Sequence, residues 1–273
     1  MKKRIPSGTV RLAAVALSGL LLAACANKEE KYVERPVDQL YNTAMATLKA
    51  GEYEKAAKQF DEVERQHPYS TWASKSELMA AFAHYEANKY DEAILAAERY
   101  KQLHPGNKDA AYAYYLIAIC YYEQIADVGR DQKITQEALH ALEEVVRRFP
   151  NSEYARDAKL KIDLARDHLA GKEMAIGRYY EDRGDYLAAI NRFKVVVEKY
   201  QTTTHVAEAL ERLTECYLAL GVTDEARTAA AVLGANYPAS DWYAHAYKLL
   251  TGQHLTPKEN KASWMSRAFN SVF

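Results

Sequence analysis

GEYEKAAKQFDEVERQHP, residues 51–68 of this 273-residue chain, has counterparts at four later places in the sequence. One marker of the repeat is an alanine, which recurs as Ala56, Ala93, Ala138, Ala189 and Ala226. A second marker is a residue pair that follows each alanine at a constant distance, as His67-Pro68, His104-Pro105, Phe149-Pro150, Tyr200-Gln201 and Tyr237-Pro238. Because five units agree at two fixed positions, the pattern indicates a structural repeat and not a chance period.

The repeating unit resembles the tetratricopeptide repeat, which consists of a helix, a tight turn, a second helix and a proline. Small side chains stand where the two helices of a unit approach each other, for example Ala44 in the first helix and Ala56 in the second. Phe60 and Val63 lie three residues apart on one helix face and are expected to fill the gap to the next unit. A proline cannot continue a helix and so closes the unit. Since a single unit cannot bury its own apolar face, the units must stack.

Irregular spacing between the units locates two insertions. Successive alanine markers are 37, 45, 51 and 37 residues apart. The third unit is therefore longer by eight, and we place the extra residues in the segment EQIADVGRD, residues 123–131, between its two helices. The fourth unit is longer by fourteen, or about four helical turns. We expect a lengthened first helix or two helices in line, with Gly171 and Gly177 as weak points.

These features predict an all-α protein, a tetratricopeptide-repeat solenoid of five helix-turn-helix repeats with a lengthened helix in repeat four. Repeats 1 and 2 fall in residues 37–110. Repeats 3 to 5 fall in residues 111–251, together with a C-terminal capping helix that Ser240 begins.

The C-terminal tail covers residues 252–273 and contains one more short amphipathic segment. Met265, Phe269 and Val272 share one face of that segment if it is helical. The segment either packs on the last repeat, remains disordered or docks a partner.

The N-terminal segment, residues 1–24, has the features of a secretory signal peptide: a basic start, a short apolar run and small residues before a cleavage site. The apolar run is shorter than the roughly 20 residues that a transmembrane helix needs. Its end, LAAC at residues 22–25, resembles the bacterial lipobox, in which the cysteine is acylated. This implies a lipid such as palmitate on Cys25 and a polar tether over residues 25–36. Because no aspartate follows the cysteine, it also implies delivery to the outer membrane; ordinary cleavage is the alternative.

Composition and motifs argue against an enzyme and against a nucleic-acid-binding protein. The chain carries 36 basic and 37 acidic residues, whereas a nucleic-acid binder needs a basic field. The catalytic spacings HExxH, CxxC, GxSxG and GxxxxGK[ST] do not occur. The histidines are scattered, so we expect no metal site and no cofactor beyond the covalent lipid on Cys25. We expect Cys120 and Cys216 to be buried free thiols and not a disulfide.

The 21 tyrosines suggest a peptide-binding groove. In this type of repeat the first helix of each unit lines the concave side. Aromatic side chains with polar tips suit an extended or partly unfolded peptide. From their positions in the repeat we select five candidate groove residues, Tyr41, Tyr53, Tyr69, Phe82 and Tyr85. The alternative for each of them is a place in the core between helices.

Two longer stretches carry a resemblance to a known family. They are NSEYARDAKLKIDLARDHLA with GRYYEDRGDYLAAINRF, within residues 151–193, and LYNTAMATLKAGEYEKAAKQFDEVERQHPYS, residues 40–70. Together with the lipobox, the short tether and the long fourth repeat, they resemble the repeat-containing lipoproteins of the β-barrel assembly machine of the outer membrane. The resemblance covers essentially all of residues 21–250.

The resemblance implies a non-enzymatic scaffold attached by its lipid to the periplasmic face of the outer membrane. In that family the N-terminal repeats receive unfolded β-barrel proteins through their C-terminal β-signal. The C-terminal repeats bind the periplasmic domains of the barrel subunit BamA, beside the other lipoproteins of the machine. The arginine of the family's NR motif contacts BamA and corresponds here to Arg192. Two departures are residues 123–131, where the family often has a longer aromatic insertion, and Gln201 in place of proline.

Two other functions are compatible with parts of the sequence. One is another periplasmic repeat adaptor, for cell division or envelope polysaccharide, which would share the architecture but does not account for the lipobox and the long fourth repeat. The other is an enzyme, such as a lytic transglycosylase built on a helical solenoid, which needs a further catalytic domain of about 100 residues. Only the short segment 251–273 follows Leu250, so we expect no enzyme.

Overall fold

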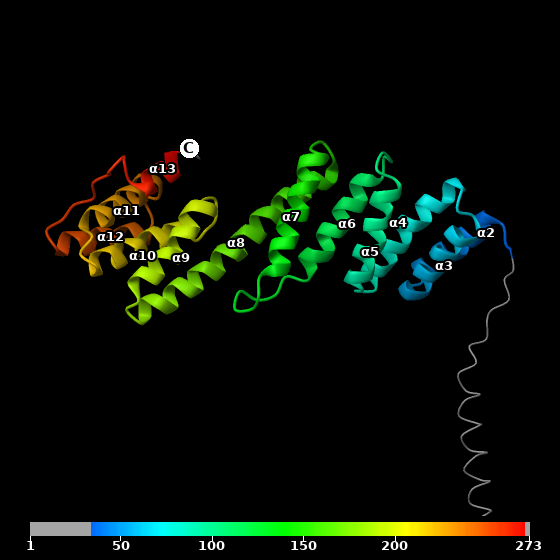
Figure 1. Cartoon of the computed structure of the whole chain (residues 1–273), viewed down its shortest axis with the longest axis horizontal. Helices are drawn as coiled ribbons and strands as arrows, with labels where there is room; N and C mark the ends of the chain where they lie inside the picture. The colour runs from blue at the N-terminus through cyan, green and yellow to red at the C-terminus, as the bar shows by residue number, and fades with distance from the viewer. Residues whose placement is uncertain (1–33, 271–273) are drawn as a thin grey trace, which may run out of the picture. The chain divides into compact units, whose positions relative to one another are not determined.

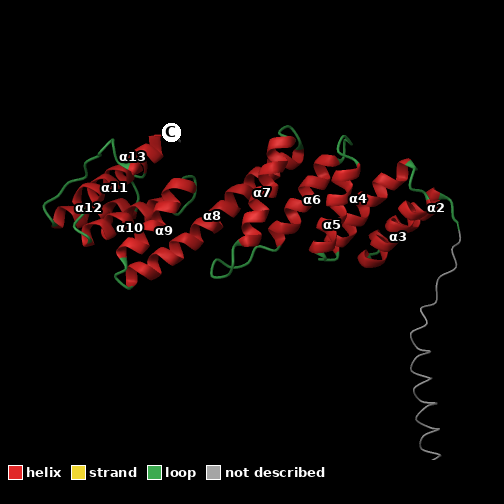
Figure 2. Cartoon of the chain, viewed as in Figure 1, coloured by secondary structure: helices red, strands yellow, loops and turns green. Residues whose placement is uncertain are grey.

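Helices make up all the regular structure of the described part of the chain. The computed structural model describes residues 34–270, and every regular element in that range is an α-helix (Figure 2). The helices are α2 (Val37–Lys49), α3 (Tyr53–Gln66), α4 (Thr71–Glu86), α5 (Tyr90–Leu103), α6 (Ala110–Glu123), α7 (Lys133–Arg148), α8 (Glu153–Asp182), α9 (Tyr186–Lys199), α10 (Val206–Ala219), α11 (Thr223–Asn236), α12 (Asp241–Gly252) and α13 (Trp264–Asn270). None of these helices is both long enough and apolar enough to cross a membrane. The predicted signal peptide, the anchor residue Cys25 and most of the tether lie outside the described residues.

The helices from α2 to α11 form five consecutive pairs. Each helix packs on the next one in the chain, and Figure 1 shows the pairs following one another from α2 to α11. First helices of neighbouring pairs also touch, since α4 contacts α2 and α6, and α6 contacts α8. The capping helix α12 packs on α10 and α11. This stack of helix-turn-helix units confirms the predicted all-α tetratricopeptide-repeat fold.

The turns inside four of the five repeats have the same backbone conformation. Gly51, Asn88, Gly184 and Gly221 all have φ between 57° and 78°, the left-handed region. Glycine enters this region without a steric penalty, and asparagine tolerates it better than most residues. The third repeat has no residue of this kind, because its turn is replaced by the inserted segment between α6 and α7. The insertion therefore lies where the spacing predicts it.

The second sequence marker is the end of the second helix of each repeat. The capping residues His67, His104, Phe149, Tyr200 and Tyr237 share a φ between −127° and −134°. In each case the cap N–H donates to the carbonyl four residues earlier. Tyr200 keeps this geometry although Gln201 follows it instead of proline. The helix end therefore does not depend on the proline.

The marker alanines lie at the contacts between helices. All five, with Ala44 and Ala81 on the facing helices, are completely buried. Phe60 and Val63 are likewise fully buried, as predicted. Phe60 belongs to a first-repeat cluster of buried residues that consists of Ala44, Leu48, Ala56, Ala57, Phe60, Ala80 and Ala83.

The lengthened helix of the fourth repeat is one continuous helix, α8, of 30 residues. It runs through Gly171 and Gly177 without interruption, so of the two alternatives the structure selects one lengthened helix. Both glycines are buried in the middle of α8, where neighbouring side chains come close. A Cβ on Gly177 would lie 2.3 Å from Cε1 of Phe193, and a Cβ on Gly171 would lie 3.2 Å from Nε2 of His205. The missing side chains therefore allow α9 and α10 to approach α8.

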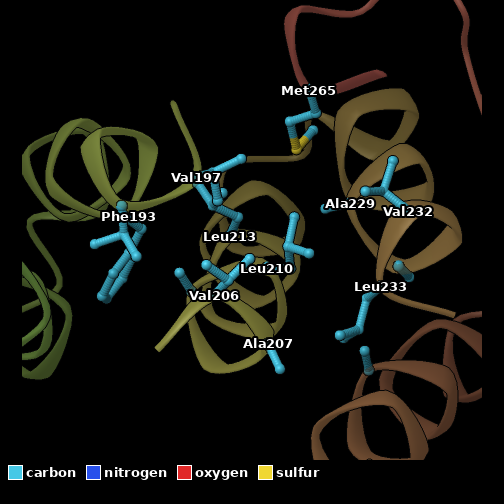
Figure 3. Packing of buried hydrophobic residues seen from close by; sticks show 14 of the residues in the cluster. Phe193, Val197, Val206, Ala207, Leu210, Leu213, Ala229, Val232, Leu233 and Met265 are labelled. Carbon is cyan, nitrogen blue, oxygen red and sulfur yellow. The ribbon is translucent and has the colours of Figure 1, made fainter. Parts of the chain in front are cut away.

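The C-terminal repeats share one continuous core, which we call the C-terminal core. It extends from Ala170 in α8 to Phe269 in α13. Figure 3 shows side chains from α9, α10 and α11 meeting, with Met265 above them. Phe193, Leu210 and Leu233 are completely buried there.

The C-terminal tail packs on the last repeats through α13. Met265 and Phe269 are buried in the C-terminal core. The amide of Gln201 donates a hydrogen bond of 3.0 Å to the carbonyl of Ala268. The glutamine that replaces the expected proline thus holds the tail, and of the alternatives for this segment the structure selects packing. Val272 lies outside the described residues.

Candidate interaction surfaces

Tyr41 and Tyr53 lie in the first repeat and are partly buried against its core. The ring of Tyr41, on α2, lies 5.7 Å from the ring of Phe60 and 4.6 Å from the ring of Trp72, measured between centroids. Burial raises the pKa of Tyr41. Tyr53, the first residue of α3, packs against the same first-repeat cluster. Each of these side chains is therefore packed against the core on one side and exposed on the other.

Phe82 and Tyr85 lie on α4, where the first two repeats meet. Phe82 packs against the first-repeat cluster. Phe82 and Tyr85 both pack against the next cluster, which consists of Ala81, Ala93, Ala97, Leu116, Ile117 and Cys120. The ring of Tyr85 lies 6.4 Å from that of Phe82 and 6.0 Å from that of Tyr90. Burial, with a smaller contribution from the charge of Glu123, raises the pKa of Tyr85. Phe82 therefore joins the two neighbouring clusters, and Tyr85 extends the second one.

Tyr69 differs from the other four candidates. It lies in the turn between α3 and α4, and its side chain is fully exposed, with a relative accessibility of 102%. The next residue, Ser70, caps α4, because its Oγ accepts a hydrogen bond of 3.1 Å from the N–H of Ala73. The cap fixes the backbone that carries the exposed ring. The structure thus separates Tyr69 from the candidates that line the two clusters.

A second group of tyrosines, where the third and fourth repeats meet, lies outside the predicted groove residues. The ring of Tyr154 on α8 lies 5.5 Å from that of Tyr112 and 5.1 Å from that of Tyr115, both on α6. Tyr115 donates a hydrogen bond of 2.5 Å to Asp157. Burial alone would raise the pKa of Asp157, but bonds from Tyr115 and Lys161 outweigh it and lower the pKa. The helix α6, with the sequence AAYAYYLIAICYYE, contains five tyrosines, and none of them is among the groove residues predicted from repeat position.

Arg192 lies on α9 and links it to the long helix. Its Nη1 is 3.2 Å from Oε2 of Glu173 on α8, and its side chain is 42% exposed. The preceding helix turn carries Leu187, which is 69% exposed. Arg192 is therefore held in place by one carboxylate while part of its guanidinium faces solvent.

The inserted segment of the third repeat, residues 124–132, rests on α8. His168 contacts the carbonyl of Ala126 through Nε2 at 2.6 Å, and because a carbonyl only accepts, this nitrogen is the donor. Lys172 donates to the carbonyl of Gly129 at 3.1 Å. The insertion therefore connects repeat three to the middle of α8.

A charged network lies between α8, α10 and α12. The guanidinium of Arg212 lies within 3.0 to 3.7 Å of four carboxylates, those of Glu181, Glu208, Glu211 and Glu215. Burial is the main reason that the pKa values of Glu181 and Glu211 are raised to about 7. For Glu211 the nearby charge of Glu215 acts in the same direction. Part of the C-terminal core is thus bordered by carboxyl groups that hold protons tightly.

The two cysteines of the described residues are buried free thiols, as predicted. Burial raises the pKa of Cys120 to about 12. Burial and the neighbouring Glu181 carboxylate also raise the pKa of Cys216, whose Sγ donates to that carboxylate at 3.3 Å. Because the thiolate is the nucleophilic form, both side chains are chemically inert at neutral pH.

The fold and these surfaces define the class of protein. Stacked helix pairs, half-buried aromatic rings on the first helices and an arginine on the α8–α9 contact are features of a repeat scaffold that binds other chains. The two thiols of the described residues are unsuited to nucleophilic catalysis.

Sequence comparison gives the family. The model of the YfiO family, described as outer membrane lipoproteins, matches residues 33–233. A Caulobacter vibrioides protein named outer membrane protein assembly factor BamD is 53% identical, over 92% of this chain and 83% of its own length. A protein of the same name from Rickettsia prowazekii is 45% identical, over 89% of this chain and 97% of its own length. Another, from Neisseria meningitidis serogroup A, is 35% identical, over 84% of this chain and 92% of its own length. The chain belongs to the BamD family of outer membrane lipoproteins.

Proposed function

We propose that this chain is a non-enzymatic scaffold of the β-barrel assembly machine, in which it helps to insert β-barrel proteins into the outer membrane. The observation that carries the proposal is the relationship to outer membrane protein assembly factors over 89% or more of the chain for two relatives. The repeat fold supports it, because stacked helix pairs supply extended binding surfaces and need no cofactor.

The C-terminal repeats are the part that binds the periplasmic domains of BamA. Two observations support this assignment. The shared C-terminal core makes repeats four and five a single packed unit. Arg192 is oriented by Glu173 yet remains partly exposed, so it is able to form a charge-assisted hydrogen bond with a partner.

The N-terminal repeats receive unfolded β-barrel proteins. Their candidate contact residues are the partly exposed aromatic side chains and the fully exposed ring in the first turn between repeats, namely Tyr41, Tyr53, Tyr69, Phe82 and Tyr85. Such rings offer contact area at a small cost in conformational entropy. Ordering an unfolded chain offsets part of the contact energy, so the substrate is held weakly enough to be passed on.

A covalent lipid on Cys25 holds the scaffold at the periplasmic face of the outer membrane. The tether over residues 25–36 would extend about 40 Å if fully stretched. That reach leaves the repeats free to engage BamA and the other lipoproteins of the machine from one anchor point.

The proposal is tested by co-purification of the tagged lipoprotein from solubilised outer membranes. Wild type is expected to bring down BamA, and Arg192→Glu is expected to lose most of it. Arg166→Glu is the matched control, because Arg166 pairs with Glu143 between α7 and α8 at 2.7 Å and is similarly exposed. We expect this control to bring down BamA as wild type does.

A charge swap separates a contact with BamA from a role in helix packing. Exchanging both charges, Arg192→Glu with Glu173→Arg, restores the pair between α8 and α9 but not a positive charge on α9. Continued loss of BamA in this double variant supports a direct contact. Recovery would show that the pair only packs the helices. Capture of cell-division or polysaccharide proteins in place of BamA would favour a different periplasmic adaptor.

A further inference from the structure

The last repeat and the capping helix meet at three side chains that are able to hold a metal ion. Glu211 and Glu215 lie four residues apart on α10, and His245 projects from α12. One ligand atom from each, a carboxylate oxygen or an imidazole nitrogen, lies within 4.8 Å of the others. Residues four apart lie on the same face of a helix, so both carboxylates face the imidazole.

Glu211 has one carboxylate oxygen without a hydrogen bond. Its side chain is completely buried. Its Oε1 lies 2.5 Å from Nδ1 of His245, but its Oε2 is buried without a hydrogen-bond partner. The nearest cation to Oε2 is Nε of Arg212, at 3.7 Å, and this nitrogen is also buried without a hydrogen bond. A buried carboxylate oxygen left in this way needs an explanation, and an ion is one of the usual ones.

The carboxylates around Glu211 outnumber the guanidinium groups that contact them. Four carboxylates, those of Glu181, Glu208, Glu211 and Glu215, share two guanidinium groups, those of Arg178 and Arg212. Arg212 gives its closest contact to Glu215, at 3.0 Å, and not to Glu211. The contact of Arg212 with Glu211, at 3.7 Å, is the longest of its four.

We propose that Glu211, Glu215 and His245 bind a divalent transition-metal ion, with Zn²⁺ as the best fit. Two carboxylate oxygens and one imidazole nitrogen form a donor set that zinc accepts, and water completes its four-coordinate shell. On binding, the proton between Oε1 of Glu211 and Nδ1 of His245 leaves to solvent, and Nδ1 of His245 and the carboxylate of Glu211, including its Oε2, become ligands.

The required movement is small. Donor atoms around a tetrahedral zinc ion are about 3.3 Å apart, given metal–ligand distances near 2.0 Å. The histidine therefore moves slightly away from Glu211, and Glu215 moves closer. The His245 side chain is 49% exposed, so the ion has a route from solvent.

The ion would join α10 to α12 and so clamp the capping helix onto the last repeat. The sequence alone predicts no metal site, because Glu211 and Glu215 are ordinary helix residues there and His245 lies far along the chain on another helix. Only the fold brings the three together.

The test uses the full lipoprotein in detergent, freed of metal with EDTA and then titrated with ZnCl₂ by isothermal titration calorimetry. We expect one Zn²⁺ per chain, proton release on binding, and a higher melting temperature with zinc than without. His245→Asn and Glu215→Gln are each expected to weaken binding at least about tenfold, as loss of even a supporting contact does at metal sites. His140→Asn, at an exposed histidine on α7, serves as the control and binds zinc as wild type does.

His245→Asn keeps the test decisive if Glu215→Gln fails to fold, because the histidine is half exposed and its loss leaves no buried gap. Absence of saturable zinc binding would overturn the proposal. Unchanged binding in His245→Asn would also overturn it, because the ion would then lie elsewhere. Equal binding of Mg²⁺ and Zn²⁺ would do the same, since a site with an imidazole ligand prefers the transition metal.

Discussion

The N-terminal and C-terminal repeats have the same helix geometry but are packed differently. In the first two repeats the buried side chains form separate small clusters, rich in alanine, that half-buried rings join. In repeats four and five, with the capping helix and α13, they form one continuous core around Phe193 and Leu210. The same repeat thus produces separate clusters of buried side chains at one end and one continuous core at the other.

The difference bears on the proposed function, in which one scaffold serves two kinds of partner. A continuous core holds its surface in one arrangement, which suits a folded partner domain. Separate clusters allow neighbouring repeats to adjust to each other, because each repeat contacts only its neighbours. Half-buried aromatic rings on such units suit a chain that has no fixed structure.

The largest expected effect comes from removing the central ring at each end. Phe193→Ala and Phe60→Ala each delete a completely buried ring, and each is expected to cost about 3–5 kcal/mol. Phe193→Ala should destabilise repeats four, five and the capping helix together, whereas Phe60→Ala should loosen only the first repeat. Hydrogen exchange measured along the chain shows which helices lose protection. Equal loss of protection throughout the chain in both variants would contradict the comparison.

A smaller effect is expected at the glycine that lets α8 approach α9. Gly177→Ala places a Cβ 2.3 Å from the Phe193 ring and is expected to cost about 1–3 kcal/mol, the usual range for overpacking. Gly252→Ala, at the end of α12, is the matched control, because its Cβ would meet no atom within 4 Å. Urea unfolding measures both variants. A Gly177→Ala chain as stable as the control would show that the two helices pack less tightly.

The charged network predicts a pH dependence that belongs to the C-terminal repeats. Burial raises the pKa of Glu181 from 4.5 to about 7, so the folded chain holds this proton more firmly than the unfolded chain. Stability therefore falls as pH rises from about 4.5 to about 7 and levels off above that range. Thermal melts in EDTA should show Glu181→Gln reducing this fall by about 1–2 kcal/mol. An unchanged slope would show that Glu181 does not hold the proton.

The smallest effect on stability is expected at the exposed ring of the first turn between repeats. Tyr69→Ala should change the free energy of unfolding by less than about 0.5 kcal/mol, as exposed positions do. Tyr41→Ala should cost more, on the order of 1–2 kcal/mol, because its ring packs on Phe60 and Trp72. A pull-down of an unfolded β-barrel protein should be weakened by both. If Tyr69→Ala leaves the pull-down unchanged, the ring has no part in substrate binding.

The sequence alone predicts the repeats well, because each marker has a local physical cause. The glycines and the asparagine of the turns adopt positive φ, and the marker alanines occupy the helix contacts. The insertion expected at residues 123–131 falls in the loop between α6 and α7, apart from its first residue, which ends α6. The inner role of Ala56 and Phe60 follows from helical periodicity. These features depend on residues close together in the chain.

Features that depend on distant residues could not be predicted in this way. Gly177 looks like a weak point of a helix until Phe193 is placed against it. In the sequence, Gln201 is only a residue in place of the expected proline. Its hydrogen bond to the carbonyl of Ala268 is seen only in the structure. The meeting of Glu211 and His245 likewise requires the position of the capping helix. That the ring of Tyr69 is exposed while the ring of Tyr41 packs on Phe60 is likewise seen only in the structure.

Site-specific photo-crosslinking tests the central claim most directly. A photo-crosslinking amino acid would replace Tyr69 in one chain and Leu187 in another, since both side chains are well exposed and lie in the N-terminal and C-terminal repeats respectively. With the assembly machine supplied with an unfolded β-barrel protein, position 69 should capture the unfolded protein and position 187 should capture BamA. Capture of BamA at position 69 and of the unfolded protein at position 187 would contradict the division of labour between the two ends.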